Sequence, residues 1–163
     1  MFVYIAGDIM SAGSQYELSQ IENVVKDLGL DYYSPIKNKG INDKKNVSVE
    51  ENNKLAEKIL REDTERLQRA DLVIFNVKEF AIGTLVELGQ VLEMMEHDAA
   101  KRCVFLYDDI RRTTLPEIGD RRSWSINQYL YGAVLKMSGG RGFVEPHELR
   151  GVLEELVAEA AQE

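Results

Sequence analysis

The residue best placed for acid–base chemistry is Asp63, which lies on the apolar stripe of a predicted helix. Asp63 follows Ile59 and precedes Leu67 at intervals of four residues, so the three side chains share one helix face. An ionised carboxylate is rarely buried without a partner, because its desolvation costs several kcal/mol. Either a neighbouring loop, Arg61 or Arg66 satisfies Asp63, or Asp63 is an acid in a cleft. In a cleft, burial would raise its pKa and let it deliver a proton near neutral pH.

A second carboxylate, Glu87, stands in the stretch FAIGTLVELGQVLEMMEHD, residues 80–98, which predicts a turn followed by a helix. Glu87 shares a polar side of this helix with Gln90 and Glu93, and the helix dipole favours a glutamate in the first turn. Periodicity alone therefore favours a solvated, structural glutamate. Gly89 favours a functional site instead, because a glycine inside a helix often lets another segment pack closely.

Two other polar residues have both structural and functional interpretations. Tyr4 lies between Val3 and Ile5 in the first apolar run, where a buried tyrosine needs a partner for its hydroxyl group. Core packing accounts for Tyr4 without any function. Asn127, in the segment SINQYLYG, is either a helix cap or a surface residue.

Strands and helices are predicted to alternate along the whole chain. Apolar runs predict strands at 2–6, 31–35, 70–77 and 102–109, and a brief strand within 139–146. Helical periodicity predicts helices at 14–30, at 50–69, within 80–98, around 124–137 and from Pro146 to Ala161. Polar stretches predict loops at 36–53 and 110–123. We therefore expect a single domain over residues 1–163, an α/β flavodoxin-like or Rossmann-like three-layer sandwich with a mostly parallel five-stranded sheet.

Ligands of such open sheets bind beyond the carboxyl ends of the strands. This places three predicted loops near one cleft: GDIMSAGS after the first strand, KEFAIGT after the third and DDIRR after the fourth. Gly7, Asp8 and Gly83 in these loops are candidate substrate-binding residues. The loops contain neither G-x-G-x-x-G nor G-x-x-x-x-G-K-[ST], so no motif supports a dinucleotide site or a P-loop.

Composition limits the classes of partner. A net charge of −8 argues against a nucleic-acid groove or an anionic membrane surface, and is compatible with small-molecule substrates. The single Cys103 excludes an internal disulfide, and His97 and His147 are too isolated to indicate a metal site. We therefore expect no metal and no organic cofactor. No signal peptide or apolar run near 18 residues is present, so the expected location is the cytoplasm.

Four segments together resemble the nucleoside 2-deoxyribosyltransferase family. They are VYIAGD at 3–8, EDTERLQRADLVIFNV at 62–77, IGTLVELGQ at 82–90 and INQYLYG at 126–132. The resemblance runs from residue 2 to about residue 135, and its most specific part is G-T-x-x-E-x-G in the third segment. It implies that Glu87 is the nucleophile, Asp63 the acid near the nucleobase and Tyr4 a hydrogen-bond donor to Glu87. It also implies a homo-oligomer in which Asn127 reaches a neighbouring subunit's site.

The implied reaction exchanges the nucleobase of a 2′-deoxyribonucleoside, as in nucleotide salvage, by a retaining double displacement through a deoxyribosyl–glutamate intermediate. One departure from the family pattern bears on base recognition. Many members carry an aspartate six residues before the nucleophile, where this chain has Ala81. The nearby Glu79 is a candidate substitute for that aspartate.

Two alternatives remain open. One is a hydrolase of the same fold that cleaves 2′-deoxynucleoside 5′-monophosphates, with Ser11, Ser14 and the adjacent backbone as phosphate donors at a helix start. The absence of arginine from that loop weighs against it. The other is a flavodoxin-like nucleoside-binding or sensor domain without catalysis.

Overall fold

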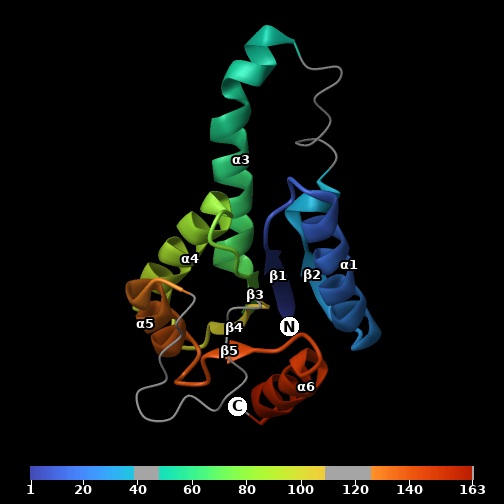
Figure 1. Cartoon of the computed structure of the whole chain (residues 1–163), viewed down its shortest axis with the longest axis vertical. Coiled ribbons are helices and arrows are strands. Elements are labelled where there is room, and N and C mark those ends of the chain that lie inside the picture. Colours follow the sequence, from blue (N-terminus) through green and yellow to red (C-terminus); the bar gives the residue numbers. More distant parts are fainter. Residues whose placement is uncertain (39–47, 109–125, 163) are drawn as a thin grey trace.

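A parallel β-sheet of five strands forms the centre of the molecule (Figure 1). The structure is a computed structural model, and it describes residues 1–38, 48–108 and 126–162. Its strands are β1 (Phe2–Ala6), β2 (Asp31–Tyr33), β3 (Leu72–Asn76), β4 (Arg102–Leu106) and β5 (Phe143–Val144), in the order β2-β1-β3-β4-β5. Every strand pair in this sheet is parallel. The predicted five-stranded sheet is therefore confirmed, and it is wholly rather than mostly parallel.

Helices cover both faces of the sheet and complete the predicted three layers (Figure 1). They are α1 (Ala12–Asp27), η1 (Pro35–Lys37, a 3-10 turn), α3 (Val49–Arg69), α4 (Ile82–Met95), α5 (Gln128–Met137) and α6 (Leu149–Ala160). Helices α3, α4 and α5 contribute to the hydrophobic cluster on one face, and α1 and α6 to the cluster on the other. In the part of the chain described above, no helix is long and apolar enough to cross a membrane.

Strand β3 shows why the sheet forms from these residues. All five of its side chains are buried, as expected for a central parallel strand covered on both faces. Because successive side chains alternate between faces, Val73 and Phe75 join the cluster of α3, α4 and α5, while Leu72 and Ile74 join the cluster of α1 and α6.

Several predicted boundaries were wrong. Helix α1 begins at Ala12 because Ser11 caps it by accepting the N–H of Ser14 at 3.1 Å. The predicted loop 36–53 includes the start of α3, where Ser48 and Glu51 form a capping box that periodicity alone did not reveal. Helix α6 begins three residues after Pro146.

The remaining differences concern the fifth helix and the loops. Helix α5 begins at Gln128, later than the predicted start near residue 124. The predicted loop at 110–123 and residues 39–47 of the other predicted loop lie outside the described residues.

The site depends on the point where the chain changes sides of the sheet. The connection from β1 to β2 passes through α1 on one face, and the connection from β3 to β4 passes through α4 on the other. Strands β1 and β3 are neighbours, so the loops that leave them diverge and open a crevice at their carboxyl ends.

A buried lysine fixes the end of α3 against the sheet. Lys101 is 4% exposed, and its Nζ donates to the carbonyl oxygens of Leu67 (3.0 Å), Gln68 (3.3 Å) and Ala70. These carbonyls lie at the C-terminal end of α3, where helical partners run out and a positive charge is favoured by the helix dipole. Lys101 therefore stabilises the helix that carries Asp63.

Replacing Lys101 by methionine should lower the free energy of unfolding by about 2–4 kcal/mol, because buried carbonyl oxygens lose their donor. Urea denaturation followed by circular dichroism would measure the change. Lys136→Met, which breaks an exposed pair with Glu96, is the matched control and should change stability by less than about 0.5 kcal/mol. Equal effects of the two substitutions would contradict the anchoring role of Lys101.

Candidate active site

A cavity of about 360 Å³ opens at the carboxyl ends of β1 and β3. We call it the switch-point cavity. It is lined by the loop after β1, the start of α4 and one side chain each from η1 and α3: Gly7, Asp8, Ile9, Met10, Pro35, Asp63, Phe80, Ala81, Ile82, Gly83, Thr84 and Glu87. The structure therefore brings together Asp63, Glu87 and all three loop residues that the sequence predicted.

Glu87 projects into the switch-point cavity from the second turn of α4 and is bound to the central strand β1. The buried Tyr4 donates its hydroxyl hydrogen to Oε1 of Glu87 at 2.6 Å. Burial raises the pKa of Glu87 to about 7, while the Tyr4 hydrogen bond lowers this pKa and the negative charge of Asp63 raises it. Burial and the charge of Glu87 raise the pKa of Tyr4 far above its ordinary value, so its hydroxyl stays a donor.

The solvated glutamate that periodicity favoured is therefore wrong for Glu87. Among the described residues, the expected close packing at Gly89 is also not found, because a Cβ placed there would meet none of their atoms within 4 Å. What distinguishes Glu87 from a solvated glutamate is its hydrogen bond with Tyr4, which lies 83 positions away in the sequence.

Asp63 reaches the same cavity from α3 and has a partner as well. Tyr33 donates its hydroxyl hydrogen to Oδ1 of Asp63 at 2.9 Å. Burial raises the pKa of Asp63, while the Tyr33 hydrogen bond and the charge of Arg66 lower it. Arg66 itself pairs with Glu62 at 3.7 Å. The partner of Asp63 is thus Tyr33 at the end of β2, rather than the expected loop or arginine, and Asp63 also faces the cleft; its role as an acid remains a prediction.

Asn127 lies outside the switch-point cavity of its own chain. It is exposed and caps α5, since its Oδ1 accepts the N–H groups of Tyr129 (2.9 Å) and Leu130 (3.2 Å). The predicted cap is confirmed. A role for Asn127 in a neighbouring subunit remains a prediction.

Ala81 occupies the N-cap position immediately before α4 and lines the cavity. It is 5% exposed, and helix α4 starts there without any side-chain cap. Glu79, the candidate substitute for the missing aspartate, is exposed and does not line the cavity. The position of Glu79 therefore does not support the idea that it takes over the role of the missing aspartate.

Tyr33 is the residue of this region that the sequence interpretation missed. It ends the short strand β2, and its contact with Asp63 spans 30 positions, so no local periodicity points to it. A tyrosine directly before Ser-Pro at the carboxyl end of a predicted strand was the available signal.

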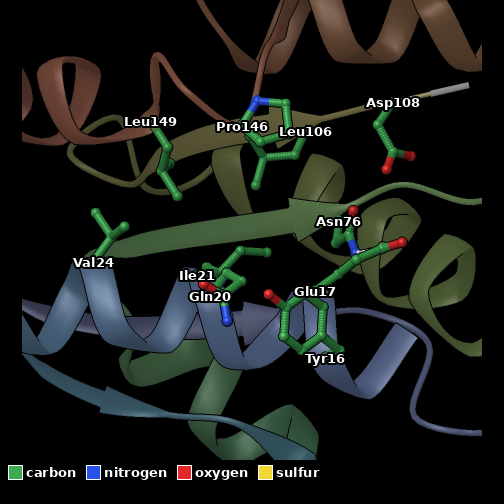
Figure 2. A pocket seen from close by; sticks show the side chains of 10 residues that line it. All are labelled: Tyr16, Glu17, Gln20, Ile21, Val24, Asn76, Leu106, Asp108, Pro146 and Leu149. Carbon is green, nitrogen blue, oxygen red and sulfur yellow. Dashed lines mark hydrogen bonds between the residues drawn. The ribbon is translucent and has the colours of Figure 1, made fainter. Parts of the chain in front are cut away.

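A second cavity, of about 140 Å³, lies on the opposite face of the sheet between α1 and the start of α6 (Figure 2). Asp108, from the predicted loop DDIRR, lines this cavity rather than the first, and residues 109–112 lie outside the described residues. Lys78 pairs with both Asp108 (2.5 Å) and Glu17 (3.0 Å), and Asn76 donates to Glu17 at 2.9 Å. The carboxylates here are thus neutralised by a lysine, unlike Glu87 and Asp63.

Comparisons with known proteins agree with this fold. A conserved protein from Enterococcus faecalis V583 is similar in structure, with a TM-score of 0.65, 22% identity and 98% of each chain covered. A 2-deoxyribosyltransferase from the psychrotolerant bacterium Bacillus psychrosaccharolyticus is similar too, with a TM-score of 0.57, 19% identity and 82% of each chain covered. No curated protein sequence matches the chain. The profile of the family described as Nucleoside 2-deoxyribosyltransferase matches residues 3–148, and the chain therefore belongs to the nucleoside 2-deoxyribosyltransferase family.

Proposed function

We propose that this protein exchanges the nucleobase of 2′-deoxyribonucleosides through a covalent deoxyribosyl intermediate on Glu87. The observation that carries the proposal is the pair of carboxylates, Glu87 and Asp63, on the walls of one cavity, each hydrogen-bonded by one tyrosine. Family membership supports a reaction at the N-glycosidic bond of nucleosides.

The chemistry divides between the two carboxylates. In the first step, an ionised Oε2 of Glu87 attacks the anomeric carbon, and the bond from that carbon to the base nitrogen breaks. Its electron pair leaves with the base, which takes a proton from Asp63. In the second step, an incoming base attacks the same carbon, returns a proton to Asp63 and releases Glu87. Two inversions at one carbon give net retention.

Burial disfavours ionisation of both carboxylates at once, so the site favours one retained proton. With its pKa near 7, Glu87 is partly ionised at neutral pH, as a nucleophile must be. Burial raises the pKa of Asp63, which favours the protonated form that an acid needs. Because the two negative charges disfavour one another, ionisation of Glu87 favours a proton on Asp63.

The loop residues supply the substrate contacts in this proposal. Asp8 is 9% exposed and accepts the N–H of Met10 through Oδ1 at 3.1 Å, which leaves Oδ2 for a sugar hydroxyl. Gly83 borders free space, since a Cβ there would meet nothing within 4 Å. Gly7 lies close to the core, because a Cβ there would lie 2.6 Å from Cδ2 of Leu18 and that side chain would have to move.

A second copy of the chain is proposed to cover the cavity. Phe80 and Ile82 line its edge yet are 68% and 74% exposed, and Val86 on the same helix is 55% exposed. Large apolar side chains grouped on one surface favour contact with a partner. A second copy at this surface would exclude water, which favours transfer over hydrolysis, and we propose that Asn127 of that copy contributes to the covered site.

The decisive experiment measures base exchange and the covalent adduct together. The native protein, given a deoxynucleoside and a different free base, should form the exchanged nucleoside. Without acceptor, its intact mass should rise by one deoxyribosyl unit, and Glu87→Ala should show neither result. Release of deoxyribose 5-phosphate from 2′-deoxynucleoside 5′-monophosphates, as the sole activity, would support the hydrolase and contradict the transferase. Nucleoside binding that Glu87→Ala leaves intact, with no turnover by the native protein, would support a binding domain.

Glu87→Gln should stabilise the protein at alkaline pH while abolishing exchange. The folded state favours protonated Glu87, so the native protein loses stability as the pH rises from about 4.5 to about 7. Glutamine has no such ionisation and can still accept from Tyr4. Near pH 8.5 we expect the variant to gain about 1–2 kcal/mol in unfolding free energy.

Urea titrations near pH 4 and pH 8.5 would measure this difference. The gain should disappear near pH 4, where both side chains are neutral. Glu93→Gln, at an exposed position on the same helix, is the control and should change little at either pH. A Glu87→Gln variant that is less stable than the native protein near pH 8.5 would contradict the assigned pKa shift.

Mixing two inactive variants tests the shared site. Glu87→Ala removes the nucleophile, and Asn127→Asp removes the amide donor while keeping a residue that can cap α5. If Asn127 serves the neighbouring subunit, co-expressed dimers of the two variants contain one intact site. Statistical mixing should then restore roughly a quarter of native exchange.

The control is co-expression of Glu87→Ala with Glu87→Gln, which should stay inactive. Full activity of Asn127→Asp alone, or no recovery in purified mixed dimers, would contradict the shared site.

A further inference from the structure

We infer that Tyr33 is a positioning residue for Asp63, and that it holds one carboxylate oxygen so that the other carries the acid's proton. The inference rests on the proposed function for its catalytic meaning. Asp63 lines the switch-point cavity, whereas Tyr33 lines a separate cavity of about 420 Å³, so the link of Tyr33 to the switch-point cavity is its contact with Asp63. Their contact is the 2.9 Å hydrogen bond from the Tyr33 hydroxyl to Oδ1.

The direction of this hydrogen bond is fixed by a third residue. Asn38 donates its amide Nδ2 to the Tyr33 hydroxyl oxygen at 3.2 Å and to Oε2 of Glu62 at 3.0 Å. A carboxylate only accepts, so the contact with Glu62 establishes which end of the Asn38 amide is the nitrogen. Because the Tyr33 oxygen already accepts from Asn38, its single hydrogen remains for Asp63.

The ring of Tyr33 is held from two sides. The Arg66 guanidinium lies over it, with Cζ 4.3 Å from the ring centroid. The ring of Tyr4 packs against it at a centroid distance of 5.4 Å. Tyr4 and Tyr33 are paired residues of the neighbouring parallel strands β1 and β2, so their side chains project from the same face of the sheet.

This arrangement determines where the proton resides. Oδ1 of Asp63 accepts from Tyr33, so a protonated Asp63 carries its hydrogen on Oδ2. Tyr4 binds Oε1 of Glu87 and in the same way leaves Oε2 to attack. The hydrogen bond from Tyr33 also lowers the pKa of Asp63 and makes it a stronger acid. A hydroxyl at position 33 therefore affects both the orientation and the acidity of Asp63.

Tyr33→Phe tests the inference because it removes the hydroxyl and keeps the ring. We expect kcat for base exchange to fall about tenfold, the change for about 1.4 kcal/mol, with KM changed less than about twofold. Without the hydrogen bond Asp63 ionises at higher pH, so the alkaline limb of the kcat profile should move to higher pH. Tyr32→Phe is the matched control, because the Tyr32 hydroxyl contacts Lys37 rather than Asp63.

A second measurement does not depend on activity. Carbon-13 NMR of protein labelled at aspartate carboxyls, with Asp63 assigned from the Asp63→Asn variant, should show Asp63 titrating at higher pH in Tyr33→Phe. Asn38→Ala should cause a smaller shift in the same direction. An unchanged Asp63 titration in Tyr33→Phe, or an equal shift in Tyr32→Phe, would overturn the inference. If the native protein performs no exchange, the proposed function fails, and the NMR titration still decides whether Tyr33 controls Asp63.

Discussion

The hydrogen bond from Tyr4 to Glu87 is the interaction on which the site depends. Its donor is completely buried in the central sheet, and its acceptor is a carboxylate that burial would otherwise keep protonated. Without Tyr4, the pKa of Glu87 would be higher still, and less of it would be ionised at neutral pH. With Tyr4, the carboxylate retains a pKa near 7 and a fixed orientation. The Tyr4 hydroxyl therefore offsets part of the cost of desolvating the ionised Glu87 carboxylate.

The surrounding fold maintains the position of Glu87 and Asp63 by packing two helices against the sheet. Helix α4 brings Glu87 over β1, and α3 brings Asp63 to the same cavity. The position of α3 depends on Lys101, a buried cation that binds carbonyl oxygens at the helix end. A rigid end of α3 matters because Asp63 lies only one helical turn before Leu67, the first residue whose carbonyl Lys101 binds. The contacts of Lys101 with the end of α3 therefore help to hold Asp63 in place at the switch-point cavity.

The sequence predicted the sheet and most helices because their signals are periodic and local. Asp63 was found the same way, since a carboxylate on an apolar stripe violates the local pattern. Glu87 obeys the pattern of α4 and could be assigned only through the family resemblance. Its burial arises because its side chain faces the crevice between β1 and β3, while Glu93 on the same side of α4 remains exposed. The role of Tyr33 and the position of Asp108 in the second cavity depend on contacts between elements distant in the sequence, which periodicity does not encode.

The pairing of β1 with β2 explains why two tyrosines can serve two carboxylates. Tyr4 and Tyr33 occupy paired positions of adjacent parallel strands, and such strands lie about 4.8 Å apart. This spacing brings the rings into contact and directs both hydroxyls to the face where α3 and α4 pack. A register shift of one residue would turn Tyr33 to the opposite face and remove the donor to Asp63. Strand register therefore places the Tyr33 hydroxyl at Asp63, so β2, although only three residues long, contributes to the geometry of the candidate site.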